Sequence, residues 1–118
     1  MNIEILEYLD GNDRSPFSDW FDLLPAVAAA KVAVAIDRIR RGLLGDAKSV
    51  GSGVSERRID YGPGYRIYFA SIRKRNVIKI AILLGGGTKK RQNKDIEIAK
   101  DRLKELKLRR RNGEKLWH

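Results

Sequence analysis

Two arginines and a lysine stand in this sequence where their side chains could hold one anion. Arg58 lies near the end of the strand-like stretch "VSERRID", and Arg66 lies near the start of the next, "YRIYFASI". A short turn containing "GPG" joins the two, so antiparallel pairing should bring the guanidinium groups close together. Lys89 follows the neighbouring stretch, and with Lys90 and Arg91 it could close the same pocket. Such a group suits a phosphate, which arginine can bind through two parallel hydrogen bonds.

The two arginines also need a counter-charge, because like charges that face each other across a strand pair are destabilising. One interpretation is that an anion from outside the protein fills the gap between Arg58 and Arg66. The other is a surface network of ion pairs with Glu56 and Asp60, which would contribute little to stability. The sequence leaves both open.

Common catalytic and metal-binding patterns are absent from the sequence. It has no cysteine, and its one histidine is His118, so no thiolate or histidine metal site is expected. The segment "GGGTKKRQ" lacks the Lys-Ser/Thr ending of a phosphate-binding loop, and a flexible turn between strand and helix is the better interpretation. We therefore expect neither a metal nor a cofactor.

The charge of the chain is high and uneven. The 118 residues carry 25 Lys and Arg against 15 Asp and Glu, a net charge of +10. Residues 1–30 have a net charge of −5, so the remainder carries +15. This asymmetry favours a basic face for nucleic acid or the ribosome, and the alternative is a solvated basic surface that keeps the protein in solution.

No stretch is both long and apolar enough to cross a bilayer, since "VIKIAILLGGG" is short and is broken by Lys79. The acidic N-terminus does not have the pattern of a secretory signal. We expect a cytoplasmic protein without membrane contact.

Length and hydrophobic pattern predict one domain at residues 1–108 and a basic C-terminal tail at residues 109–118. A short strand is expected at residues 3–9. Ser15 and Pro16 are typical of an N-cap and a first helical residue, and predict a short helix. A second helix should begin near Pro25 and bury four aliphatic residues at helical spacing: Val32, Ile36, Ile39 and Leu43.

From Asp46 the hydrophobic period changes to two, which predicts a meander of up to four antiparallel strands. In its last strand, one face should be covered by the two N-terminal helices and carries Ile78, Ile80, Ile82 and Leu84. A C-terminal helix follows "GGG" and has an apolar stripe of Ile96, Ala99, Leu103 and Leu106. The expected fold class is α+β.

The stretches "VGSGVSERRIDYGPGYRIYF" and "ILLGGGTKKRQNKDIEIAKDRL" carry three linked motifs. Together they resemble the addiction-module killer proteins, a HigB-like branch of the RelE/ParE toxin superfamily. Members typically show "K-V-G-x-G-V-x-E-L-R-I", then "G-P-G-Y-R-V-Y-F", then "L-L-x-G-G-D-K-x-x-Q-x-x-D-I". The resemblance covers about residues 14 to 106. The chain departs from it at Arg57, where some members have leucine, and at Thr88, where many have aspartate.

The resemblance implies a RelE-like fold, with two N-terminal helices packed on a mainly antiparallel curved sheet and a C-terminal helix. It also implies the toxin of a type II toxin–antitoxin system, since most relatives cleave mRNA in the ribosomal A site without a metal. The implied partners are the ribosome with its mRNA and a HigA-like helix-turn-helix antitoxin that masks the basic face. Operator DNA would be bound only through the toxin–antitoxin complex.

The resemblance also implies roles for single residues. Arg66 matches the arginine after Gly-Tyr that contacts the scissile phosphate in ribosome-dependent members, and Arg58 and Lys89 match basic positions beside it. These three are the candidate catalytic residues. The further candidates for RNA binding are Arg57, Tyr65, Tyr68, Lys90, Arg91, Gln92 and Asp95.

Four of these candidates have a structural alternative. Tyr65 and Tyr68 could stack on a splayed base, or each could pack against its strand neighbours. Gln92 and Asp95 match the family's "Q-x-x-D" and could read a base edge, although capping the last helix is the safer interpretation.

Cleavage of RNA through its own 2′-OH needs a base for that hydroxyl, positive charge for the phosphorane-like transition state and an acid for the 5′ oxygen. The sequence supplies the positive charge generously. Candidate bases are Glu56, Asp60 and Asp95, and candidate acids are Lys89, Lys90 and Tyr65. Two alternatives remain: a ParE-like inhibitor of DNA gyrase without nuclease activity, and a non-catalytic nucleic-acid-binding module.

Overall fold

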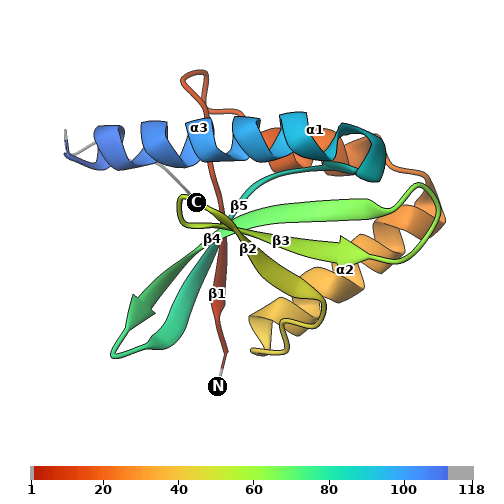
Figure 1. Ribbon diagram of the computed structural model, residues 1–118, viewed down its shortest axis with the longest axis horizontal. Helices are drawn as coiled ribbons and strands as arrows, with labels where there is room; N and C mark the ends of the chain where they lie inside the picture. Colours follow the sequence, from red (N-terminus) through yellow and green to blue (C-terminus); the bar gives the residue numbers. More distant parts are fainter. Residues whose placement is uncertain (1, 112–118) are drawn as a thin grey trace.

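The structure is a computed structural model that describes residues 2–111 (Figure 1). Its elements, in chain order, are β1 (Glu4–Glu7), α1 (Pro16–Asp22), α2 (Ala26–Arg40), β2 (Ala47–Gly51), β3 (Val54–Ile59), β4 (Tyr65–Lys74), β5 (Val77–Thr88), the short 3₁₀ helix η1 (Lys89–Arg91) and α3 (Gln92–Arg111). The first three residues of the predicted basic tail continue α3, and residues 112–118, with His118, lie outside the described residues. Within residues 2–111, no helix has the length and apolarity that a membrane span requires.

The strands form one five-stranded sheet in the order β1-β5-β4-β3-β2. The strands β2 to β5 make the predicted antiparallel meander, and β1 adds in parallel beside β5. The sheet is therefore mixed but mainly antiparallel, and the α+β class is confirmed. Because β1 pairs with β5, the last strand of the meander lies inside the sheet and not at its edge.

Helices cover both faces of this sheet, and Figure 1 shows α2 and α3 on opposite sides of it. The prediction for the face of Ile82 and Leu84 is wrong: these residues pack under α3, against Leu103 and its neighbours. The helices α1 and α2 cover the other face, which includes Ala81 and Leu83. The sequence pattern misled because β5 is an interior strand, and interior strands are apolar on both faces.

The buried stripe of α2 also differs from the predicted one. It consists of Ala28, Val32, Ala35 and Ile39, all of which are buried. Ile36 is only partly buried, and Leu43 is 57% exposed because the helix ends before it. Gly42 adopts a left-handed backbone conformation with φ of 82°, which turns the chain away from the helix axis.

The glycines at 85–87 belong to β5 and do not form the predicted turn. A Cβ on Gly86 would lie 2.3 Å from the Trp20 ring, and a Cβ on Gly87 would lie 2.0 Å from the Oδ2 atom of Asp95. The helices α1 and α3 pack so closely on the two faces of this segment that no side chain fits at Gly86 or Gly87. Glycine is here a packing requirement and not a source of flexibility.

The start of α1 is capped as predicted. The Oγ atom of Ser15 accepts the N–H of Ser18 at 3.0 Å, and it also donates to the Glu7 carboxylate at 2.5 Å. We expect Ser15→Ala to lower the free energy of unfolding by about 1 kcal/mol, because an N-cap hydrogen bond is lost. Urea denaturation followed by circular dichroism measures the change. Ser49→Ala, at an exposed position of β2, is the control, because its hydroxyl accepts only a longer hydrogen bond, from the N–H of Gly51 at 3.3 Å. An equal effect of both variants would contradict the capping role.

Candidate anion-binding site

The strand register places the two arginines directly opposite each other. Arg58 of β3 pairs with Arg66 of β4, and Arg66 in turn pairs with Gly87 of β5. The turn between β3 and β4 is sharp because Gly62 and Gly64 take left-handed conformations, with φ of 55° and 78°. It is also fixed to the end of β5, since the backbone N–H of Lys89 donates to the carbonyl oxygen of Gly64 at 2.9 Å.

A pocket of 450 Å³ opens at this end of the sheet. It is lined by Asp46, Arg58, Ile59, Asp60, Gly62, Pro63, Gly64, Arg66 and Lys89. The three candidate catalytic residues therefore line one pocket. Asp46 also lines the pocket, which the sequence analysis did not predict. Its backbone carbonyl accepts the N–H of Arg58 at 2.9 Å. The pairing of β2 with β3 could have indicated this position, because Asp46 directly precedes β2.

Glu56 lies beneath the pocket and is completely buried. Its Oε1 atom accepts the Nε–H of Arg58 at 3.1 Å and lies 3.8 Å from the NH1 atom of Arg66. The side-chain amide of Gln92 donates to both carboxylate oxygens, at 3.1 and 2.8 Å. Burial alone would raise the pKa of Glu56, but the hydrogen bonds from Gln92 and Arg58 and the charge of Arg66 outweigh it, and the pKa is lowered. Glu56 is thus a structural counter-charge and a poor general base.

The carboxylate leaves part of the arginine hydrogen-bonding capacity unused. The buried Nε–H of Arg66 has no acceptor among the described residues. Arg58 is 36% exposed, and Lys89 is exposed and forms no ion pair within residues 2–111. The internal network that the sequence suggested therefore exists on one side of the arginines, while their other side faces an open pocket.

The pocket also holds carboxylates that could move a proton. Asp46 and Asp60 line it, both are exposed, and neither forms an ion pair among the residues that the structure describes. An acceptor for a proton, two guanidinium groups and an ammonium group thus lie around one cavity. This combination fits the chemistry of a phosphodiester better than that of a neutral substrate.

Several predicted RNA-binding residues lie elsewhere. Arg57 points to the opposite face of the sheet from Arg58, where it lines the groove against α2. Lys90 and Arg91 are exposed on η1 and do not line the pocket. The alternation of side chains along β3 separates adjacent arginines, so the sequence should have assigned Arg57 and Arg58 to different faces.

The two tyrosines are core residues. Tyr65 packs edge-on against Trp20, with ring centroids 6.3 Å apart, and Tyr68 is 1% exposed. Burial and the negative charges of Glu56 and Asp95 raise the pKa of Tyr68. Of the two interpretations, the structure supports packing against neighbours, because both rings are buried in the interior strand β4. Tyr65 does not line the pocket of Arg66, so it is not placed to act as a general acid there.

Gln92 and Asp95 do not cap α3 as predicted. Gln92 is the first residue of the helix, and its side-chain amide donates to the carboxylate of Glu56. Asp95 lies in the first helical turn over Gly87, 3.9 Å from the Nε atom of Arg91. Burial raises its pKa. It lines a separate hollow beside Tyr68 and not the pocket of Arg66, so it is not placed to act as base there.

Metal ligands do not cluster in the pocket of Arg66 or in the hollow beside Tyr68. Among residues 2–111, no three side chains of the types His, Cys, Asp and Glu are close enough together to hold an ion. The positive charge available to an anion in this pocket comes from Arg58, Arg66 and Lys89.

The shifted pKa of Glu56 predicts a pH dependence of stability. Because the pKa is lower in the folded chain than its ordinary value of 4.5, the ionised carboxylate stabilises the fold above that pH. This contribution is lost as the pH falls from 4.5 through the folded-state pKa. We expect Glu56→Gln to show a shallower loss of unfolding free energy in acid than the wild type, measured by urea denaturation between pH 3 and 7. An unchanged slope would contradict the low pKa.

Comparison with known proteins identifies an uncharacterized relative of this chain. A protein of Haemophilus influenzae (strain ATCC 51907 / DSM 11121 / KW20 / Rd), described only as an uncharacterized protein, is 43% identical over 93 residues, which cover 78% of this chain and 90% of that protein. The chain belongs to the same family as that protein. No family model and no solved structure matches it.

Proposed function

We propose that this protein is a RelE-like toxin of the HigB-like branch, a metal-independent endoribonuclease that cleaves mRNA on the ribosome. The observation that carries the proposal is the pocket in which Arg58, Arg66 and Lys89 converge at the Gly-Pro-Gly turn. The same residues stand in the motifs that resemble the killer proteins. Two arginines beside a lysine supply the positive charge that a scissile phosphate requires.

The proposed reaction is attack of a ribose 2′ oxygen on the adjacent phosphorus. The O2′–P bond forms and the P–O5′ bond breaks, which leaves a 2′,3′-cyclic phosphate and a free 5′ hydroxyl. Asp60 accepts the proton of the 2′ hydroxyl, and the ammonium of Lys89 donates a proton to the leaving 5′ oxygen. Arg66 and Arg58 hold the non-bridging oxygens, whose negative charge increases in the transition state.

The partners follow from the same proposal. A HigA-like helix-turn-helix antitoxin would cover the basic face, and the complex would bind operator DNA through the antitoxin. The substrate would be mRNA on translating ribosomes, so the place of action would be the cytoplasm. Overall, the order of elements and the mainly antiparallel sheet support a RelE-like fold.

The test is cleavage of a defined mRNA by the purified protein, with and without translating ribosomes. Primer extension maps the cut sites, and phosphatase and kinase treatment identifies the ends. We expect cuts only with ribosomes, ending in cyclic phosphate. Cleavage in translating complexes that are isolated in limiting magnesium, with no other divalent metal added, checks that no further metal is needed.

Absence of cleavage in both settings would overturn the nuclease proposal. If growth inhibition in cells persisted together with that result, supercoiling by purified gyrase would be the next assay, since a gyrase inhibitor needs no nuclease pocket. Binding to RNA without cleavage or growth inhibition would instead indicate a non-catalytic binding module.

A further inference from the structure

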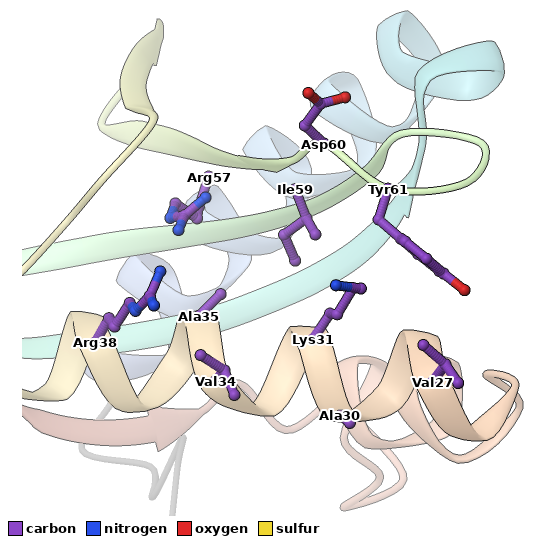
Figure 2. Close-up of a pocket in the computed structure, with 10 residues that line it drawn as sticks. All are labelled: Val27, Ala30, Lys31, Val34, Ala35, Arg38, Arg57, Ile59, Asp60 and Tyr61. Atoms are coloured by element: carbon purple, nitrogen blue, oxygen red, sulfur yellow. The ribbon is translucent and has the colours of Figure 1, made fainter.

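A second hollow of 480 Å³ lies between α2 and β3, on the opposite face of the sheet from Arg66 (Figure 2). We call it the α2 groove. Its floor is apolar, with Ala35 of α2 and Ile59 of β3, and its outer wall is the turn residue Tyr61. Figure 2 shows side chains from α2 and from β3 on its two sides. It meets the proposed nuclease pocket at Ile59 and Asp60, which line both, and its other lining residues are different.

One wall of the α2 groove is an exposed apolar strip of α2. Val27 and Val34 are 56% and 50% exposed and lie seven residues apart, with Ala30 between them. They are separate from the buried stripe, so α2 is apolar on two sides. A soluble helix normally has one apolar side, and a second exposed one is typical of a contact surface.

Three cations border the strip without a carboxylate partner. The Lys31 ammonium lies over the Tyr61 ring, 4.8 Å from its centroid, and Arg38 lies at the other end of the groove near Arg57. None of the three forms an ion pair with a described residue, because Asp37, the acid nearest in sequence on α2, is engaged by Arg40 and Arg41.

Arg57 is the most constrained of these cations. It is 9% exposed, its Nε–H has no acceptor among residues 2–111, and its NH1 group donates to the carbonyl oxygen of Arg58. Burial lowers its pKa, the negative charge of Asp46 opposes this, and the like charge of Arg38 lowers it further. Two arginines that face each other in this way need an anion, and Asp60 is the one carboxylate that lines the groove.

We propose that the α2 groove binds an acidic amphipathic helix of a partner protein. The strip from Val27 to Arg38 comprises twelve residues of α2 and is about 16 Å long, which is three turns of a docked helix. Aliphatic residues of the partner pack between Val27 and Val34, and its carboxylates bind Arg38, Arg57 and Lys31. Nucleic acid fits less well, because the floor is aliphatic and Lys31 already covers the face of the one aromatic ring.

The test uses a synthetic 18-residue peptide, labelled with fluorescein, that has leucine at every third or fourth position and glutamate at most others. Fluorescence anisotropy with the full-length protein measures its binding. Two further peptides have lysine in place of glutamate, or serine in place of leucine. We expect the glutamate–leucine peptide alone to bind, with a dissociation constant that rises with salt.

Matched protein variants locate the contact. Val34→Asp and Arg38→Glu should each weaken binding at least tenfold, as charge reversal or loss of an apolar anchor at an interface does. Arg73→Glu, an exposed arginine at the far end of β4, is the control for charge and should leave binding unchanged. Arg66→Ala should also leave it unchanged, which separates this surface from the anion pocket. Thermal melts show that the variants remain folded.

Three outcomes would overturn the proposal. The first is peptide affinity that does not change in Val34→Asp and Arg38→Glu. The second is self-association in sedimentation that Val34→Asp abolishes, because the occupant would then be a second copy of the chain. The third is competition by a 20-nucleotide RNA whose own binding is lost in Arg38→Glu, since the groove would then be part of a nucleic-acid surface.

Discussion

Replacement of Arg66 by alanine is expected to lower the rate of mRNA cleavage on the ribosome by about 100- to 1,000-fold, the usual effect of removing one group that stabilises an oxyanion transition state. Arg66 is the most buried cation of the pocket, since it is 6% exposed and its NH1 atom lies 3.8 Å from Glu56. Its burial limits the orientations of the guanidinium group before any substrate arrives. Single-turnover kinetics with excess protein over ribosomes measure the chemical step directly.

Two variants separate orientation from charge. Arg66→Lys keeps the positive charge but cannot form two parallel hydrogen bonds, so we expect it to retain only part of the activity. Arg73→Ala removes an exposed arginine from the other end of the same strand and should be fully active. If Arg66→Ala and Arg73→Ala reduced cleavage equally, with the same dependence on salt, the pocket would have no special role and the surface charge as a whole would explain binding.

Sequence reasoning correctly placed Arg58, Arg66 and Lys89 around one pocket because that prediction depended on local features. A turn of fixed length joins β3 to β4, so the distance of Arg58 and Arg66 from the turn determines that they pair. The position of Lys89 follows for the same reason, since β5 pairs with β4 up to Thr88. Such inferences require only the alternation of a strand and the closure of a short turn.

The errors concern contacts between elements that are far apart in the sequence. The pairing of β1 with β5 made β5 an interior strand, which decided the burial of both its faces. The burial of Tyr65 and Tyr68 in β4 depends on the helices packed on that strand, α1 on one face and α3 on the other. The contact of Gln92 with Glu56 joins residues 36 positions apart, and no local pattern indicates it. The same holds for Gly86 and Gly87, whose role depends on Trp20 and Asp95 from other elements.

Loss of Glu56 should destabilise the fold strongly. It is the counter-charge of Arg66, and both side chains are shielded from water, with 0% and 7% of their surface exposed. Glu56→Ala would leave the guanidinium of Arg66 buried without a carboxylate and Gln92 without its acceptor. We expect the free energy of unfolding to fall by about 3–5 kcal/mol, the usual cost of breaking a buried ion pair on one side. Urea denaturation at pH 7 measures it.

Asp37→Ala is the matched control, because Asp37 also binds two arginines, at 2.7 and 3.2 Å, but on the exposed surface of α2. It should change stability little, since exposed ion pairs contribute little. Glu56→Gln should lie between the two, because the amide keeps the shape of the side chain but not its charge. An effect of Glu56→Ala no larger than that of Asp37→Ala would show that Arg66 does not depend on this carboxylate.

Phosphate should partly rescue the Glu56→Ala variant, and this result would connect the stability of the fold to its proposed function. Without Glu56, Arg58 and Arg66 face each other across the strand pair with no buried counter-charge, while the pocket beside them remains open to anions. A bound anion stabilises the folded chain in proportion to the logarithm of its concentration. We expect phosphate to raise the melting temperature of Glu56→Ala more than chloride at equal ionic strength, and to do so less in the wild type. Equal effects of the two salts would mean that the arginines do not form an anion site.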